Sequence, residues 1–179
     1  MGTAGRPEPS LLMLAAISRY EDALAWAVER LSALSGPPLL QSGLLPFGDT
    51  DYYRPTMGDN LRVQLSAFGE IDPGGLAAVK LNTNRLEADF AAEAGRAEAR
   101  PLNLDPGYLS AGKFVLATTK DASHRIYLRD GIFGEVTLHF SRGAWRERDW
   151  TYPNYRREDY KDFLLACRKL LLAELRSKR

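Results

Sequence analysis

The amino-acid sequence predicts an α/β fold of the α+β type. We expect a ferredoxin-like βαββαβ core that is extended by a short helix, an antiparallel hairpin or meander, and a C-terminal helix. Three observations lead to this prediction: a short, continuous apolar run at 11–17, several stretches with the apolar spacing of amphipathic helices, and an alternating pattern around a turn within 124–140. The 179 residues fit one globular unit over 11–179 after a disordered tail over 1–10.

The first half of the core is predicted to contain a strand, a helix and two further strands. The run 11–17 has the composition of a buried strand, and Ser18 and Glu21 have the spacing of a capping box that begins a helix. The inward face of this helix carries Leu24, Ala27, Leu31 and Leu34, and Gly36 with two following prolines ends it. Strands are predicted over 39–47 and over 61–67, where apolar and polar residues alternate.

The tripeptide Asp-Pro-Gly occurs twice and predicts two helix starts. Asp72 and Pro73 suit the N-cap and the first position of a second long helix, which Gly95 ends. Its inward face carries Leu76, Val79, Thr83, Leu86 and Phe90. After a short strand at 102–104, the second copy, Asp105-Pro106-Gly107, predicts a shorter helix that ends near Thr118.

The segment 124–140 predicts an antiparallel hairpin. A two-residue turn would place Glu135 opposite Ile126 and mix polarity on both faces. A three-residue loop over 129–131 instead places apolar residues on one face of the hairpin and mainly polar residues on the other. The face toward the core then carries Ile126, Leu128, Ile132, Val136, Leu138 and Phe140. This register makes Arg125 and Glu135 direct cross-strand partners.

The end of the chain predicts one more strand and a closing helix. The strand is expected over 144–150. The apolar stripe of the final helix is Tyr160, Phe163, Leu164, Cys167, Leu170 and Leu171, with Arg176, Lys178 and Arg179 at its negative end.

Composition and charge exclude several classes of protein. The net charge is +1, from 24 basic and 23 acidic residues, so no global attraction to nucleic acid or to a membrane is expected. The only cysteine is Cys167, which fits a reducing cytoplasm and packs on an apolar helix face. We read no signal peptide, and the run at 11–17 is too short to span a bilayer. The oligomeric state is not encoded in any pattern that we recognise.

From Phe47 onward the sequence resembles an uncharacterised bacterial family, domain of unknown function 4416. The matching segments are 46–47, 50–53, 57–58, 71–73, 83–84, 135–138 and 150–153. The resemblance is strongest in three further segments, Asn103-Leu104-Asp105-Pro106-Gly107-Tyr108-Leu109, Leu116-Ala117-Thr118-Thr119-Lys120-Asp121 and Ser123-His124-Arg125-Ile126-Tyr127-Leu128. The resemblance supplies no activity. Members often carry a GTP-binding label, so the resemblance makes GTP binding a claim to test.

The GTP claim has one motif to support it. Gly107 to Lys113 fits the first seven positions of a P-loop, but Phe114 stands where a Ser or Thr should hold Mg²⁺, and no guanine-reading motif is present. A predicted helix N-terminus at Asp105 suits an anion in general, or is a plain N-cap.

A local basic cluster predicts a site for a small anion. Lys113, Lys120, His124 and Arg125 would bind a phosphate or carboxylate, while Asp105, Glu135 and His124 would act in acid–base catalysis or orient the cations. The alternative is a solvated face with an Arg125–Glu135 pair. His124 and His139 fall on opposite faces of the hairpin, so no metal site is predicted.

Aromatic residues predict either the walls of this site or an interaction surface. Tyr52, Tyr53 and Tyr108 would line the site of a small phosphate- or carboxylate-bearing ligand, such as a nucleotide. Alternatively, the aromatic loops at 49–53 and 150–155 would bind a protein or RNA without catalysis. The sequence identifies neither a cofactor nor a reaction.

Overall fold

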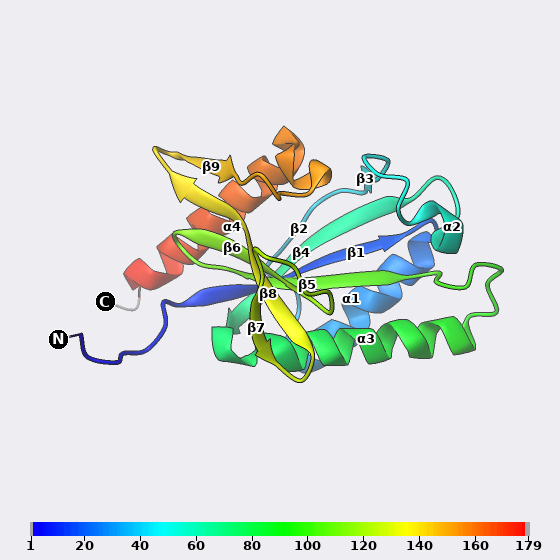
Figure 1. Ribbon diagram of the computed structural model, residues 1–179, viewed down its shortest axis with the longest axis horizontal. Coiled ribbons are helices and arrows are strands. Elements are labelled where there is room, and N and C mark those ends of the chain that lie inside the picture. The colour runs from blue at the N-terminus through cyan, green and yellow to red at the C-terminus, as the bar shows by residue number, and fades with distance from the viewer. Residues whose placement is uncertain (1, 178–179) are drawn as a thin grey trace.

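The central strand of the sheet is β1 (Ser10–Ser18), which is buried along its whole length. In the computed structural model, which describes residues 2–177, this strand has helices on both of its faces (Figure 1). Leu11, Met13, Ala15 and Ile17 belong to one core cluster, and Leu12, Leu14 and Ala16 belong to another. A continuous apolar run is required here because alternate side chains point to opposite, equally covered faces.

Around β1, the described residues form an antiparallel sheet of nine strands. The others are β2 (Leu40–Gln41), β3 (Leu45–Pro46), β4 (Arg62–Ile71), β5 (Asn103–Leu109), β6 (Lys113–Thr118), β7 (Ile126–Arg129), β8 (Ile132–Ser141) and β9 (Ala144–Glu147). The order is β2-β4-β1-β5-β6-β8-β7, with β3 beside β4 and β9 beside β8. Both neighbours of β1 are antiparallel to it. The α/β class is therefore observed, but the ferredoxin-like core is not confirmed.

Two helices cover one face of the sheet, and a third covers the other. The first pair is α1 (Glu21–Ser35) and α3 (Leu76–Glu93), and α4 (Glu158–Ser177) packs on the opposite face (Figure 1). Shorter pieces are α2 (Arg54–Met57) and the 3₁₀ turns η1 (Pro73–Gly75) and η2 (Pro153–Arg156). In the described part of the chain, no helix combines the length and apolarity that a membrane span requires.

The stripe predicted for the last helix is confirmed. Tyr160, Leu164, Cys167 and Leu171 of α4 are buried, and Phe163 and Leu170 pack partly buried against the same core. Burial raises the pKa of the Cys167 thiol to about 12, so this side chain is a core residue and not a nucleophile. Lys178 and Arg179 lie outside the described residues.

One predicted helix cap is confirmed and one is wrong. The Asp72 Oδ1 atom accepts a hydrogen bond from Gly74 N at 2.9 Å, as an N-cap does. At α1, however, Tyr20 occupies the N-cap position without a side-chain cap. The hydroxyl of Ser18 accepts from Tyr20 N and donates to the carbonyl of Pro101 at 2.7 Å. Ser18 therefore connects β1 to the start of β5 instead of forming a capping box.

The short helix predicted over 105–118 is wrong, because this segment forms the hairpin of β5 and β6. Asp105 is consequently a strand residue and not an N-cap. A Cβ atom on Gly107 would lie 2.3 Å from the carbonyl oxygen of Val115, so the two strands approach closely only at a glycine. The P-loop-like stretch from Gly107 to Lys113 lies on these strands and their turn, with no helix after it.

We expect Gly107→Ala to lower the free energy of unfolding by about 1–3 kcal/mol, because the new methyl group overlaps the backbone of β6. Urea denaturation followed by circular dichroism measures this change. Gly112→Ala is the matched control, since no atom lies within 4 Å of its Cβ position. Equal stabilities for the two variants would contradict the close approach.

The predicted hairpin exists, with a different turn. Asp130 and Gly131 form a two-residue turn between paired Arg129 and Ile132, and an irregularity at Leu128 restores the expected register, in which Ile126 faces Gly134. Ile126 and Leu128 are 71% and 40% exposed, so their predicted core positions are wrong. The reason is topological: β7 is the outer strand of the sheet.

Candidate functional site

Strands β5 and β6 separate beyond Gly107 and Leu116, the last pair that they form. Side chains of α3 take the place of the missing strand partner. Glu87 accepts a hydrogen bond from Leu104 N at 2.7 Å, and the Lys80 ammonium donates to Leu104 O at 2.7 Å. The backbone of β5 is thus satisfied without β6, and the sheet can remain open at this point.

A cavity of about 370 Å³ lies over this opening. Its lining includes aliphatic residues of the sheet (Ala15, Ile17, Leu116 and Ala117), aromatic residues (Phe47, Tyr52, Tyr53, Tyr152 and Tyr155), and charged residues (Lys80, Arg100, Asp105, Lys120, Arg125 and Glu135). No residue of α4 is part of this lining, whereas η2 contributes three. The cavity therefore occupies the end of the sheet face that α4 leaves uncovered.

Lys80 and Arg100 meet two carboxylates on the β5 side of the cavity. Lys80 is 4% exposed, and its Nζ atom lies 3.5 Å from Asp105 Oδ1 and 3.9 Å from Glu87 Oε1. Arg100 Nη2 donates to Glu87 Oε2 at 2.8 Å. Burial disfavours the charge of Arg100, but Glu87 and Asp105 outweigh it and raise the pKa of the guanidinium. The Arg100 guanidinium is therefore held in the charged form at this edge.

Glu135 is the centre of a hydrogen-bond network on the other side of the cavity. This carboxylate is only 2% exposed and accepts from Arg125 Nε at 3.0 Å and from Thr137 Oγ1 at 3.2 Å. His124 Nε2 lies 3.1 Å from Glu135 Oε2, which requires the proton on Nε2, and its ring stacks on Trp150. The predicted Arg125–Glu135 pair is therefore observed, in a buried position.

Arg125 has all three guanidinium nitrogens bonded within the protein. Besides Glu135, its Nη1 donates to the carbonyl of Lys120 at 2.9 Å and its Nη2 donates to the Tyr152 hydroxyl at 2.7 Å. These bonds hold the segment 118–125 and η2 around the cavity. Arg125 is thus mainly a structural cation, although it lines the cavity.

Lys120 and Tyr52 form the mouth of the cavity. The Lys120 ammonium donates a hydrogen bond to the Tyr52 hydroxyl and lies 3.9 Å from the centre of its ring. The bond to Lys120, then the charge of Lys120 and the more distant charge of Arg100, lower the pKa of Tyr52. Burial instead raises the pKa of Tyr53, with a further contribution from Asp105. Tyr52 therefore faces positive charge at the mouth, and Tyr53 lies deeper.

Most of the residues predicted from the sequence lie together. The cavity brings together Tyr52, Tyr53, Asp105, Lys120, Arg125 and Glu135, with His124 bonded behind Glu135.

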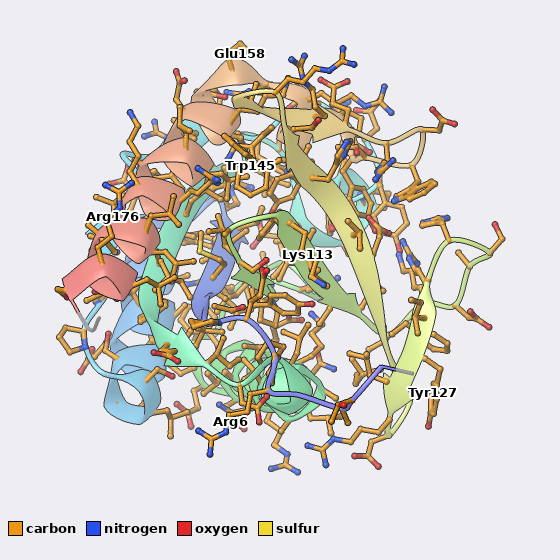
Figure 2. All side chains as sticks on the ribbon, turned by 90° about the vertical axis from the view of Figure 1, so that its left-hand side faces the viewer. Arg6, Lys113, Tyr127, Trp145, Glu158 and Arg176 are labelled. Atoms are coloured by element: carbon orange, nitrogen blue, oxygen red, sulfur yellow. The ribbon has the colours of Figure 1, made fainter. Side chains whose placement is uncertain are left out.

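Lys113 and Tyr108, which the sequence also suggested for this site, do not line the cavity. They line a separate pocket of about 140 Å³ near Ser110. Figure 2 shows Lys113 at the end of the molecule that is on the left of Figure 1, whereas α2, which follows Tyr53, is on the right. Their assignment to one site with Lys120 is wrong.

Sequence reasoning missed Lys80, Glu87 and Arg100. A signal was available for two of them, since Lys80, Thr83, Glu87 and Phe90 share one helical face, and polar residues on an inward face indicate a site. Asn103 donates to Asp105 at 2.8 Å, which orients that carboxylate. Arg100 lies in a loop without periodicity. Within residues 2–177, no group of three or more His, Cys, Asp or Glu side chains is arranged to hold a metal ion.

Comparison with known proteins gave one match. The chain belongs to the family described as Domain of unknown function (DUF4416), whose model matches residues 8–171. Searches of curated proteins and of solved structures each returned nothing.

Proposed function

We propose that this member of the DUF4416 family binds a small phosphate- or carboxylate-bearing molecule in the cavity between β5 and β6. One observation carries the proposal: four basic side chains from three separate segments line a single cavity, against two carboxylates. They are Lys80, Arg100, Lys120 and Arg125, facing Asp105 and Glu135. Convergent charge in a concave site attracts and orients an anion.

Arg100 and Lys120 are the cations best placed to contact the ligand. Among the described residues, the Arg100 guanidinium has one hydrogen-bond partner, Glu87, and its side chain is 37% exposed. Its planar fork therefore retains donors for a bidentate contact with a carboxylate or phosphate. Lys120 is exposed at the mouth and, within residues 2–177, has no carboxylate partner. Lys80 and Arg125 add positive charge behind them, since both already donate hydrogen bonds to groups within the protein.

The proposal concerns binding, and it assigns different roles to the three residues that the sequence suggested for catalysis. Both oxygens of Glu135 already accept hydrogen bonds, so we assign it to positioning Arg125. His124 bonds to Glu135 behind the lining and supports the same network. Asp105 is the carboxylate with remaining capacity, because it accepts from Asn103 and lies at the longer distance of 3.5 Å from Lys80.

A thermal-shift screen with nucleotides, sugar phosphates and carboxylates, with and without Mg²⁺, tests the proposal. A ligand at about 100 times its Kd stabilises the folded state by about 2.7 kcal/mol, which raises the Tm of a chain of this size by roughly 5–10 °C. We expect Lys120→Gln to reduce the shift and Lys113→Gln, the same change outside the cavity, to leave it intact. A screen without any shift would overturn the proposal.

A second candidate function is a non-catalytic domain that binds a protein or RNA. The observation in its favour is the exposure of Tyr52, Trp150 and Tyr152, of which Tyr52 and Tyr152 line the cavity. The indole of Trp150 is nevertheless bonded to Val136 O at 3.0 Å, and Tyr152 accepts from Arg125. Titration with fluorescent single-stranded RNA separates the candidates, since RNA binding that survives Lys120→Gln and is lost in Tyr52→Leu would favour base stacking.

A further inference from the structure

We infer that the ligand of the cavity is a planar aromatic acid that carries a single negative charge. This inference rests on the proposed function and narrows it to a class of molecule. It combines two properties of the cavity that the proposal does not use: how its charges are paired, and what the remaining surface is made of.

In the part of the chain that the structure describes, the charges of the cavity leave one positive charge without a carboxylate partner. Arg125 pairs with Glu135 at 3.0 Å, Arg100 pairs with Glu87 at 2.8 Å, and Lys80 lies 3.5 Å from Asp105. Each of these three cations is neutralised locally. Lys120 is different, because its partner is the neutral hydroxyl of Tyr52. The charge that completes this cavity is therefore one negative charge, and a polyanion would bring several charges without partners.

The surface between the charges suits an aromatic ring. The sheet contributes Ala15, Ile17, Leu116 and Ala117, which are aliphatic and small or medium in size. Aromatic side chains complete the walls, and Tyr53 makes edge-to-face contacts with both Phe47 and Tyr52, at centroid distances of 5.5 and 5.1 Å. Rings in this arrangement favour a further ring by offset or edge-to-face contact.

Several polar groups of the lining are already bonded within the protein. The hydroxyls of Tyr152 and Tyr52 accept from Arg125 and Lys120, so each offers a ligand mainly its O–H donor, and Asn103 donates to Asp105. A sugar would lose hydrogen bonds to water that this lining replaces only in part. The volume of about 370 Å³ lies in the lower range of ligand pockets, which suits a compact molecule of one or two rings.

The mouth fixes the orientation of such a ligand. Lys120 bonds to Tyr52 there, and Arg100 is close enough for its charge to act on the same phenol. A carboxylate at this point meets Lys120, the open donors of Arg100 and the Tyr52 hydroxyl. The ring then points inward, toward Tyr53 and Leu116.

Matched probe pairs test the two properties separately by isothermal titration calorimetry. The pair 2-naphthoate and 2-naphthamide differs in charge, and we expect the acid to bind about tenfold more tightly. The pair benzoate and cyclohexanecarboxylate differs in aromaticity, and we expect benzoate to bind about threefold more tightly. GTP with Mg²⁺ and inorganic phosphate are the polyanionic probes, and we expect both to bind more weakly than 2-naphthoate.

Three exposed positions supply the variants. Lys120→Gln should remove most of the preference for 2-naphthoate over 2-naphthamide, and Tyr52→Leu should weaken 2-naphthoate about fivefold. Lys113→Gln, outside the cavity, should change neither. If phosphate or GTP binds in a Lys120-dependent manner and more tightly than 2-naphthoate, the aromatic inference is overturned and the proposed anion site stands. If no anion binds, the proposed function is overturned and the inference with it.

Discussion

Replacing Glu135 with alanine is expected to lower the free energy of unfolding by about 3–5 kcal/mol, the range for breaking a buried ion pair from one side. The substitution leaves the Arg125 guanidinium, 9% exposed, without its carboxylate, and removes the acceptor of His124 and of Thr137. Because Arg125 also holds the Lys120 carbonyl and the Tyr152 hydroxyl, we expect the cavity wall to loosen and ligand binding to be lost.

Urea denaturation at neutral pH measures the loss of stability for Glu135→Ala. The control is Asp130→Asn, which removes the charge of a carboxylate that is more than half exposed and lies 3.8 Å from Arg129. Asparagine tolerates the positive φ of this turn position, so the control should change stability by less than about 1 kcal/mol. Glu135→Gln should lie between the two, because the amide keeps one acceptor but no charge. A loss for Glu135→Ala no larger than for Asp130→Asn would show that the network does not hold this wall.

Lys80→Met is expected to lower the free energy of unfolding by about 2–4 kcal/mol, although methionine is apolar and of similar length. The change removes the donor to Leu104 O and the cation beside Asp105, at a position that is 4% exposed. Glu87 keeps its bonds to Arg100 and Leu104 N, so the loss is smaller than for Glu135.

A double-mutant cycle checks this interpretation of Lys80. Adding Asp105→Asn to Lys80→Met should recover about 1 kcal/mol, because the carboxylate that lost its cation becomes neutral. Lys113→Met, at an exposed position, is the control and should be nearly neutral. Simple additivity of Lys80→Met and Asp105→Asn would contradict a direct interaction between the two side chains.

The parts of the fold that could be predicted are those that local pattern determines. The stripe of α4 and the Asp72 cap were correct because a 3.6-residue period and an N-cap need only neighbouring residues. The second Asp-Pro-Gly has the same local signal, yet it lies in β5. Its state is decided by pairing with β1 and β6, and by the close approach at Gly107. Long-range pairing of this kind overrides local preference.

The site residues that could be predicted are those whose contacts follow from the register of paired strands. Arg125 and Glu135 were paired correctly because the polarity of the hairpin fixes which residues face each other, even though the turn itself was wrong. Lys113 was grouped with Lys120 from proximity in sequence, but Lys113 begins the six-residue strand β6 and Lys120 lies beyond its other end. Lys80 and Arg100 reach the cavity only because β5 and β6 diverge, and no local pattern encodes that opening.

The most direct test of the account is calorimetric titration of the wild-type protein, Lys120→Gln and Lys113→Gln with benzoate and with inorganic phosphate. The account predicts that at least one of the two anions binds the wild type, that Lys120→Gln weakens it about fivefold or more, and that Lys113→Gln keeps it within about twofold. Absence of binding by both anions, or an equal loss in both variants, would contradict an anion site in the cavity between β5 and β6.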